Sequence, residues 1–370
     1  MHYHQVLDTG ELGGGNLYAL AIAERLKAQG ESAPVWIGGG GPALAETERR
    51  GLPPRSFDQN RLRGGGIRAI LELGKLAWRF RREKGLVHNS SVHTYGLMSR
   101  AYSAAGIRTV AHVQIESNAE SYRWAFRKPP TAIVTCAQFL VKQLEEALPA
   151  ETWKTCRIVA VPNSVDVAWF FRGDRATAKR TVGAPSNRPL ILMAANLAMH
   201  KGQLTAIRAM AELRTLGTDA ELWLAGVERG GEIAFTARLH ELVKELNLGE
   251  RVKFLGQRSD MPELMRAADA FVLPSTNEGL PLTLLEAQAS GLPVLAAPTA
   301  GVPEIIAHGE TGFLIAADDA GGYARHLHEL FRQPELGEKL LTKAFSRVIE
   351  QYTMDAMFGN LRKVYAEVMR

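Results

Sequence analysis

Cysteine is scarce in this sequence: Cys136 and Cys156 are the two cysteines among 370 residues. Two thiols cannot build a disulfide framework or a zinc site of four thiolates, and this favours a reducing compartment. No run of about 18 apolar residues occurs, which excludes a transmembrane helix. The first residues lack a basic segment followed by an apolar one, so we expect no secretory signal and a cytoplasmic protein.

Two specific phosphate-binding patterns are also missing. No GxxxxGK[ST] segment occurs, which disfavours a P-loop ATPase. The glycines at 13–15 follow an expected strand but do not complete GxGxxG, because Tyr18 stands at the closing position, and no acidic residue ends the second expected strand. A nicotinamide cofactor is therefore disfavoured. The glycine loop is either a phosphate cradle or a plain turn.

Charge is unevenly distributed along a chain of ordinary globular composition, with 46% hydrophobic and 22% charged residues. Residues 1–166 carry 21 Lys and Arg against 15 Asp and Glu, whereas the remainder carries 23 against 24. The basic half suits an anionic partner, and a merely solvated surface is the alternative. Because the basic residues form no recognised reader motif, we expect no nucleic-acid partner.

Short apolar runs alternate with helical patterns along the chain, which predicts βαβ units and parallel sheets covered on both faces. A polar stretch near 162–175, with Pro162 and Gly173, interrupts the pattern, so we expect two doubly wound α/β domains that meet there. Ligands bind such sheets outside the carboxyl ends of the strands. The expected strands are 2–8, 33–37, 86–89, 109–115, 132–136, 189–197, 221–227, 252–256, 270–275, 293–298 and 312–316.

Residues 271–315 contain the richest site pattern. We expect a strand to end at Ser275, a tight turn to hold Glu278, and a helix to begin around Pro281, whose missing N–H costs nothing in the first turn. The backbone N–H groups of residues 279, 280, 282 and 283 would then form an anion site. Glu286 follows among apolar neighbours, where a carboxylate needs a donor such as the two hydroxyls of a ribose.

The two glutamates are separated by seven residues in EGLPLTLLE and resemble the paired-glutamate motif of the family 4 retaining glycosyltransferases. The flanking segments agree: LPST precedes the pair, and EAQASGLPVLAAPTAGVPEII and GETGFLI follow it. PNSVD at 162–166, HKGQLTAIRAM at 200–210 and ERVKFLGQRSDMPELMRAADAFVLPS at 250–275 resemble further family segments. The resemblance covers residues 160–315 and, more weakly, the first 30.

This resemblance implies a GT-B fold, in which two doubly wound Rossmann-like domains face each other across a cleft. It implies an acceptor-side domain over 1–165 and a nucleotide-sugar-binding domain over 166–352, with a C-terminal helix of about 353–370 packed back on the first. The implied activity is retaining transfer of a hexose or N-acetylhexosamine unit from a nucleotide sugar, in our expectation UDP-linked, to a hydroxyl. We expect a sugar, a lipid-linked sugar or a small molecule as acceptor, in bacterial cell-envelope or exopolysaccharide synthesis.

The resemblance also implies residue roles. It places Glu286 on the donor ribose, Glu278 on the sugar and Lys201 on the diphosphate, where a fixed ammonium stabilises the departing charge. Since no carboxylate–metal dyad is then required, we expect neither a metal nor a cofactor. One departure is Asn196, which stands where the family carries an arginine. The implied donor-binding positions are Gly14, Gly15, Asn196, Gly279, Leu280, Pro281, Leu282, Thr283 and Glu286.

Two features of the first half suggest the other side of the reaction. His112, near the strand-end histidine of the family, is either catalytic or a core histidine. Gln114 occupies the strand end itself. Arg123 and Trp124 belong to a cationic-aromatic cluster suited to an acceptor sugar or phosphate.

The segment 61–84 is strongly basic and has an apolar helical face. It suits a phosphorylated acceptor or an anionic lipid, which would give peripheral contact with the inner face of the membrane; a covering helix whose apolar side packs on the sheet is the alternative. The apolar face consists of Ile67, Ile70, Leu71, Ala77 and Trp78.

Two other functions remain open besides envelope synthesis. Asn196 motivates a non-catalytic protein that binds nucleotide sugars, and a small-molecule acceptor would make the chain a natural-product glycosyltransferase. A nucleotide-sugar epimerase is disfavoured by the paired glutamates and by PNSVD.

Overall fold

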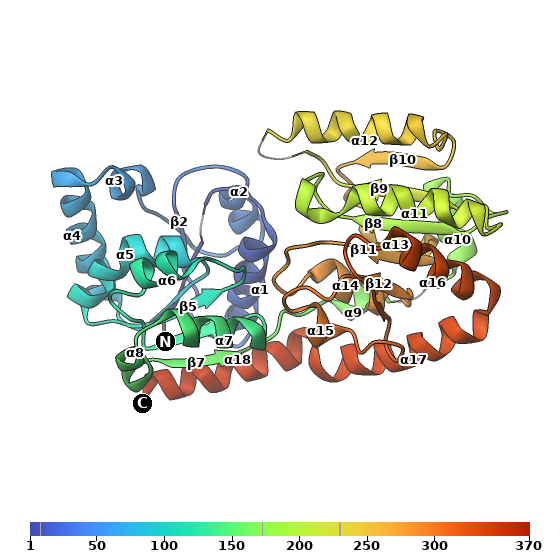
Figure 1. The fold of residues 1–370 in the computed structure, drawn as a ribbon. Helices are drawn as coiled ribbons and strands as arrows, with labels where there is room; N and C mark the ends of the chain where they lie inside the picture. Colours follow the sequence, from blue (N-terminus) through green and yellow to red (C-terminus); the bar gives the residue numbers. More distant parts are fainter. Residues whose placement is uncertain (8, 172, 229–230) are drawn as a thin grey trace. The chain divides into compact units, whose positions relative to one another are not determined.

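The computed structural model describes residues 1–7, 9–171, 173–228 and 231–370. These residues form two compact units. Unit 1 comprises Met1–Asn163 and Met357–Arg370, and unit 2 comprises Ser164–Ala356. Each unit is built on one parallel β-sheet with helices packed against it (Figure 1). The expected two doubly wound α/β domains are confirmed.

Unit 1 contains a seven-stranded sheet in the order β3-β2-β1-β4-β5-β6-β7. Its strands are β1 (Tyr3–Val6), β2 (Val35–Ile37), β3 (Pro54–Ser56), β4 (Leu86–Asn89), β5 (Arg108–Val113), β6 (Ala132–Thr135) and β7 (Arg157–Ala160). Its helices are α1 (Gly14–Ala28), α2 (Pro42–Arg49), α3 (Gln59–Gly64), α4 (Gly66–Glu83), α5 (Val92–Ala105), α6 (Ala119–Ala125), α7 (Gln138–Ala147), α8 (Ala150–Thr155) and most of α18 (Met354–Met369).

Unit 2 contains a six-stranded sheet in the order β10-β9-β8-β11-β12-β13. Its strands are β8 (Leu190–Ala194), β9 (Glu221–Ala225), β10 (Val252–Gly256), β11 (Ala270–Leu273), β12 (Val294–Ala296) and β13 (Phe313–Leu314). Its helical elements are α9 (Val167–Phe170), α10 (Arg175–Val182), the 3-10 turn η1 (Met199–Lys201), α11 (Gln203–Thr215), α12 (Ile233–Glu245), α13 (Met261–Ala267), α14 (Leu282–Ala289), α15 (Val302–Ile305), α16 (Ala320–Arg332) and α17 (Pro334–Gln351).

The strands form where the sequence offers short, continuous apolar runs. Every residue of β8 and β9 is buried, as expected for parallel strands covered on both faces. The sheet of unit 1 also contains β3 and β7, which the sequence pattern did not reveal. Both are edge strands, and their residues are half-buried or exposed, so they lack the continuous apolar run of a central strand. Asp8, the last residue of the first expected strand, lies outside the described residues.

Helix starts are fixed by side chains that accept otherwise unpaired backbone N–H groups. Ser91 accepts the N–H of Thr94 at the start of α5, and Asn118 accepts that of Ser121 at the start of α6. Among the described residues, no helix combines the length and the apolarity needed to cross a bilayer.

The end of the chain completes unit 1. Tyr365 of α18 shares a 2.6 Å hydrogen bond with Nδ1 of the buried His88 on β4, and Arg362 donates to the hydroxyl of Tyr3 on β1 at 3.1 Å. Figure 1 shows α18 alongside β7, where Glu367 pairs with Arg157. Residues separated by most of the sequence therefore stabilise one core.

Candidate active site

The predicted donor-binding residues of unit 2 lie on loops at the carboxyl ends of β8 and β11. These strands are neighbours in the sheet and run parallel, so the loops that follow them emerge at the same edge. The loop after β8 carries Asn196 and Lys201, and the loop after β11 carries Glu278 and leads into α14. Ligands of parallel sheets bind at this edge.

Lys201 and Glu278 form an ion pair at the centre of this edge. Nζ of Lys201 lies 2.9 Å from Oε1 of Glu278, and the two side chains are 20% and 10% exposed. An ion pair so far removed from water is less screened than a surface pair. The ammonium group of Lys201 is thus fixed in position by the carboxylate of Glu278.

Backbone contacts hold the lysine loop against the glutamate loop. The N–H of Thr276 donates to the carbonyl of His200 at 2.8 Å, and the hydroxyl of Ser275 donates to the carbonyl of Lys201 at 3.3 Å. The approach requires glycine at position 202, where φ is +80° and a Cβ atom would lie 2.0 Å from the carbonyl oxygen of Pro274. Glycine alone tolerates both conditions.

The start of α14 presents unpaired amides next to this ion pair. Pro281 is the N-cap, and the helix begins at Leu282, one residue beyond the expected start. The N–H groups of Leu282 and Thr283 have no hydrogen-bond acceptor within the described residues. The preceding turn is anchored by the N–H of Gly301, which donates to the carbonyl of Gly279 at 3.0 Å, while Leu280 is buried beneath it. Such a helix start attracts an anion.

Glu286 is a half-buried carboxylate within α14. In the described part of the chain, no hydrogen bond or ion pair reaches its side chain. Burial without a compensating partner raises its pKa to about 7. A carboxylate in this state gains from two hydroxyl donors, the chemistry that a ribose offers.

Asn196, the departure from the family pattern, is exposed on the same edge. Its carbonyl accepts a 2.8 Å hydrogen bond from the buried Gln203, which fixes the backbone of this loop. The side chain is a neutral amide, so it supplies hydrogen bonds to a ligand but no countercharge. At the centre of this sheet edge, the positive charge available to an anionic ligand is therefore that of Lys201.

In unit 1, the glycine loop forms the start of α1 and touches the end of β5. Gly14 is the first helical residue. A Cβ atom on Gly15 would lie 2.7 Å from Oε1 of Gln114, so the glycine loop and the end of this side chain are close neighbours. Asn16 holds the loop shape by donating to the carbonyls of Thr9 and Glu11 at 3.1 and 2.8 Å.

Gln114 is a site residue that sequence reasoning placed at the strand end without assigning it a role. Its Nε2 is buried and has no hydrogen-bond partner among the described residues. The carbonyl of the same residue accepts the thiol of Cys136 at 3.2 Å. An unsatisfied amide beside a glycine loop is a group that a polar ligand can satisfy.

His112 lies deeper, in the core beneath this loop. Its ring stacks on His88 with centroids 5.3 Å apart and meets the edge of Tyr18 at 5.1 Å. Neither ring nitrogen has a hydrogen-bond partner among the described residues. Burial, reinforced by His88, holds its pKa well below the usual range. The histidine is therefore neutral, and its catalytic role stays a prediction.

Arg123 and Trp124 on α6, which the sequence suggested for acceptor binding, both contact neighbouring residues of unit 1. Arg123 donates to the carbonyl of Ala147 at the end of α7, at 3.0 Å. The Trp124 ring stacks on His93 at 5.5 Å and lies under the guanidinium of Arg127 at 5.1 Å. Both side chains remain exposed, and acceptor binding stays a prediction for them.

The structure thus assembles the predicted residues into two local groups. Unit 2 brings together Lys201, Glu278 and the start of α14, and unit 1 brings Gly15 to Gln114. His112 is buried below the second group. Over the described ranges, no cluster of three or more His, Cys, Asp and Glu side chains has the arrangement of a metal site.

Comparisons with known proteins agree with this organisation. Residues 174–347 match the family model described as glycosyl transferases group 1. The chain is 30% identical to the N-acetyl-alpha-D-glucosaminyl L-malate synthase of Bacillus anthracis over 58% of this chain and 54% of that enzyme, so it spans about half the length of this relative. It is 27% identical to the D-inositol 3-phosphate glycosyltransferase of Stackebrandtia nassauensis over 95% of this chain and 87% of that enzyme.

Solved structures share the fold. The crystal structure of Anabaena HepE in complex with UDP matches with a TM-score of 0.88 at 21% identity, over 99% of this chain and all of that one. The sucrose-phosphate synthase of Thermosynechococcus elongatus matches with a TM-score of 0.78 at 18% identity, over the whole of this chain and 99% of that one. Residues 174–347, which make up most of unit 2, thus form a domain of the glycosyl transferases group 1 family.

Proposed function

We propose that this protein is a retaining, metal-independent glycosyltransferase that moves a sugar from a UDP-linked donor to a hydroxyl acceptor. The observation that carries the proposal is the pairing of Lys201 with Glu278 at 2.9 Å beside the unpaired amides of α14. Loss of a nucleoside diphosphate develops negative charge, which a fixed ammonium and helix-start amides stabilise. Lys201 leaves Glu278 for the diphosphate when donor binds, and Glu278 is then free to accept a sugar hydroxyl.

Further observations support the donor. Glu286 is half-buried and unpaired, as a ribose-binding carboxylate would be before its ligand arrives. The similar Anabaena protein HepE was crystallised with UDP and with UDP-glucose, which favours UDP over other nucleotides. We assign the residue 279–283 backbone to the same donor, and donor binding by Gly14 and Gly15 stays a prediction.

The acceptor side of the proposal rests on unit 1. Its basic sequence and the exposed Arg123 and Trp124 suit a hydroxyl compound that carries negative charge. The similar malate and inositol phosphate enzymes are named for acceptors of this kind. We propose a cell-envelope or exported saccharide as acceptor, with a free small molecule, as in natural-product glycosylation, as the alternative.

A panel of nucleotide sugars tests the central claim. Calorimetry with a chelator present should find one tightly bound donor, and chromatography should find slow release of its nucleoside diphosphate. Failure of every donor to bind would refute the proposal. Turnover that appears when Mg²⁺ or Mn²⁺ is restored, and not before, would refute metal independence alone.

The Lys201→Ala variant tests the assigned role of the ammonium. Turnover should fall by roughly 10²-fold or more, because the charge of the leaving group loses its countercharge. The exposed Lys244 on α12 offers a matched control, and Lys244→Ala should keep the wild-type rate. Equal rates for the two variants would remove Lys201 from the site.

A non-catalytic, donor-binding protein is the second candidate, and Asn196 is the observation that favours it. Without an arginine at this position, the diphosphate meets a neutral amide. This candidate predicts tight donor binding with no release of nucleoside diphosphate under any condition. Asn196→Arg should then restore turnover, whereas it should change the rate of an active enzyme little.

A further inference from the structure

Helix α4 has two apolar faces, and one of them points outward. At 3.6 residues per turn, the buried Ala69, Leu76 and Phe80 share one side of the helix. A second set of apolar residues recurs at helical spacing on the opposite side and is exposed. These residues are Ile67, Ile70, Leu71 and Trp78, with 77%, 66%, 68% and 59% of their surface exposed. We call this set the outer stripe.

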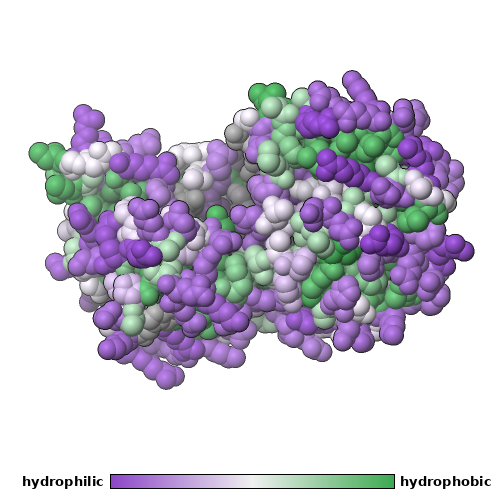
Figure 2. Space-filling view, in the orientation of Figure 1, coloured by the Kyte–Doolittle hydropathy of each residue, from purple (hydrophilic) through white to green (hydrophobic). Residues whose placement is uncertain are grey.

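The outer stripe corrects one interpretation of the sequence. The alternative that this apolar face packs on the sheet is wrong, because its residues are exposed, and the contact with the sheet is made by Phe80, whose ring lies 4.6 Å from that of Trp36 on β2. Figure 2 shows hydrophobic atoms at the outer edge of unit 1, over α3 and α4, bordered by hydrophilic atoms. Isolated exposed apolar residues are common in proteins, but a contiguous stripe along one helix marks an interaction surface.

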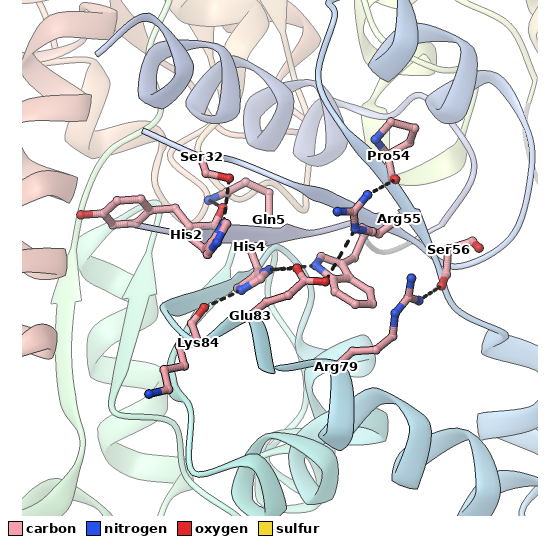
Figure 3. Close-up of polar contacts among 12 residues, drawn as sticks. His2, His4, Gln5, Ser32, Pro54, Arg55, Ser56, Arg79, Glu83 and Lys84 are labelled. Atoms are coloured by element: carbon pink, nitrogen blue, oxygen red, sulfur yellow. Dashed lines mark hydrogen bonds and ion pairs between the residues drawn. The ribbon is translucent and has the colours of Figure 1, made fainter. Parts of the chain in front are cut away.

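Polar contacts fix the inward face, so the stripe cannot turn toward the core. Glu72 accepts the N–H of Asp58 at 3.1 Å. Figure 3 shows the other end of the helix, where Arg79 donates to the carbonyl of Ser56 at 3.3 Å and Glu83 lies 3.9 Å from Arg55. The helix is therefore held with the stripe presented to its surroundings.

The network in Figure 3 also keeps the buried His4 uncharged. Trp36 donates its indole N–H to Nδ1 of His4 at 3.1 Å, so the proton of His4 lies on Nε2 and is donated to the carbonyl of Lys84 at 2.9 Å. Burial lowers the pKa of His4, in agreement with a neutral ring. His4 therefore adds no charge to the core that supports α4.

Positive charge borders the outer stripe along its length. The two carboxylates of α4, Glu72 and Glu83, lie on the inward side, as their contacts show. Arg82 places its guanidinium over the Trp78 ring at 4.9 Å, which joins the apolar stripe to the basic border. The exposed basic residues of α4, which we call the basic border, are Arg68, Lys75, Arg81 and Arg82.

We propose that α4 docks unit 1 on an anionic lipid surface, with the outer stripe inserted at the acyl boundary and the basic border against the headgroups. A helix with an apolar stripe, a tryptophan and a Lys/Arg-rich flank is suited to lie in the plane of a membrane interface. Nucleic acid would pair with the arginines but would leave the aliphatic stripe in water. An acidic protein would not require a flat stripe that extends along the helix.

Vesicle flotation with the full chain tests this proposal. Vesicles of phosphatidylcholine with about one third phosphatidylglycerol should carry the protein, and vesicles of phosphatidylcholine alone should not. Binding should fall steeply between 0.1 and 1 M salt, because the Debye length shrinks from about 10 to about 3 Å. Protein that stays unbound with anionic vesicles at low salt would overturn the proposal.

Two pairs of substitutions separate the contribution of the basic residues to vesicle binding from that of the apolar residues. Arg68→Glu with Lys75→Glu should lower vesicle binding by at least tenfold, because each basic residue near such a surface contributes about fivefold, or about 1 kcal/mol. Ile67→Ser with Leu71→Ser should lower it by a similar factor at high and low salt alike. Matched controls in unit 2 are Lys339→Glu and Ile233→Ser, which should leave binding unchanged. Circular dichroism checks that all variants are folded.

Tryptophan fluorescence tests whether Trp78 enters the membrane, and light scattering tests whether a second copy of the chain covers the outer stripe instead. Vesicles should shift tryptophan emission to the blue in the wild type, and Trp78→Phe should abolish most of the shift. Light scattering should show that the Ile67→Ser, Leu71→Ser protein has the oligomeric state of the wild type. A dimer that the serine substitutions dissociate, with vesicle binding unchanged, would overturn the proposal in favour of a second copy of the chain.

Discussion

At the scale of single residues, the candidate site of unit 2 combines one ion pair with one carboxylate that has no hydrogen-bond partner among the described residues. Lys201 neutralises Glu278, and Glu286 remains half-buried and unpaired. A carboxylate that burial leaves unsatisfied destabilises the fold unless a ligand or a proton compensates it. Glu286 therefore lowers the stability of the free protein.

The Glu286→Gln substitution measures this cost. The folded carboxyl has a pKa of about 7, and the unfolded one has a pKa of about 4.3, so the folded state binds the extra proton between these values. Wild-type stability therefore falls as pH rises from 4.3 to 7, and the glutamine avoids this loss. Urea unfolding should show the variant equal to wild type near pH 4.5 and about 1–3 kcal/mol more stable at pH 8.

The exposed Glu212→Gln on α11 is the control for this experiment, and its difference from wild type should not change with pH. Donor affinity of the glutamine variant should fall at the same time, because an amide accepts hydroxyl hydrogen bonds more weakly than a carboxylate does. A pH-independent difference for Glu286→Gln would contradict the account.

At the scale of elements, the site depends on two loops held at van der Waals distance. The lysine loop and the loop after β11 share hydrogen bonds between residues 200–201 and 275–276. Gly202 makes this approach possible through both its conformation and its lack of a side chain. The sequence HKG predicts the lysine but not the neighbour that requires the glycine.

Gly202→Ala should therefore damage stability and turnover together. The methyl group would meet the carbonyl of Pro274 at 2.0 Å, in a backbone conformation that is already strained for alanine. We expect a loss of about 2–4 kcal/mol in the free energy of unfolding and a displaced Lys201. Thermal unfolding and donor turnover measure the two effects.

Gly217→Ala separates the effect of backbone strain from the effect of the collision with Pro274. Gly217 has φ of +84° with nothing within 4 Å of the added methyl group, so this variant suffers the backbone strain without the collision. It should lose only about 1 kcal/mol and keep full turnover. If both variants behave alike, the contact with Pro274 does not position the loop.

At the scale of the whole molecule, the chain ends in unit 1 after forming unit 2. The last helix supplies Tyr365 to the buried His88, whose pKa burial lowers to about 3. His88 is therefore neutral, and the tyrosine satisfies one of its nitrogens. The end of the chain is part of the core that lies beneath the glycine loop.

Tyr365→Phe should destabilise unit 1 selectively. Loss of the hydroxyl leaves a buried nitrogen of His88 unpaired, at about 1–3 kcal/mol. Hydrogen exchange should then accelerate in β1 and β4, with β8 and β9 unaffected. Tyr352→Phe is the matched control, because its hydroxyl donates to the carbonyl of Glu304 within unit 2 at 2.7 Å. Exchange that accelerates equally in both sheets would contradict this division.

The sequence by itself determined the fold class and the elements on which the candidate site residues lie. Parallel strands buried on both faces need continuous apolar runs, and a helix start after a strand needs a characteristic turn, so both leave local signals. The turn that holds Glu278 and the helix that holds Glu286 were therefore expected before any coordinates, whereas Lys201 was singled out by the family resemblance. Edge strands β3 and β7 left no such signal, since one or both faces of an edge strand meet solvent.

Only the tertiary structure decided which groups meet and which face outward. The collision that forbids a side chain at Gly202, the contact between Gly15 and Gln114, and the bond from Tyr365 to His88 join residues distant in sequence. Periodicity shows that α4 has apolar residues on two sides, but the sheet covers only one of them. The neighbours of each helix, which no local pattern encodes, left the outer stripe exposed.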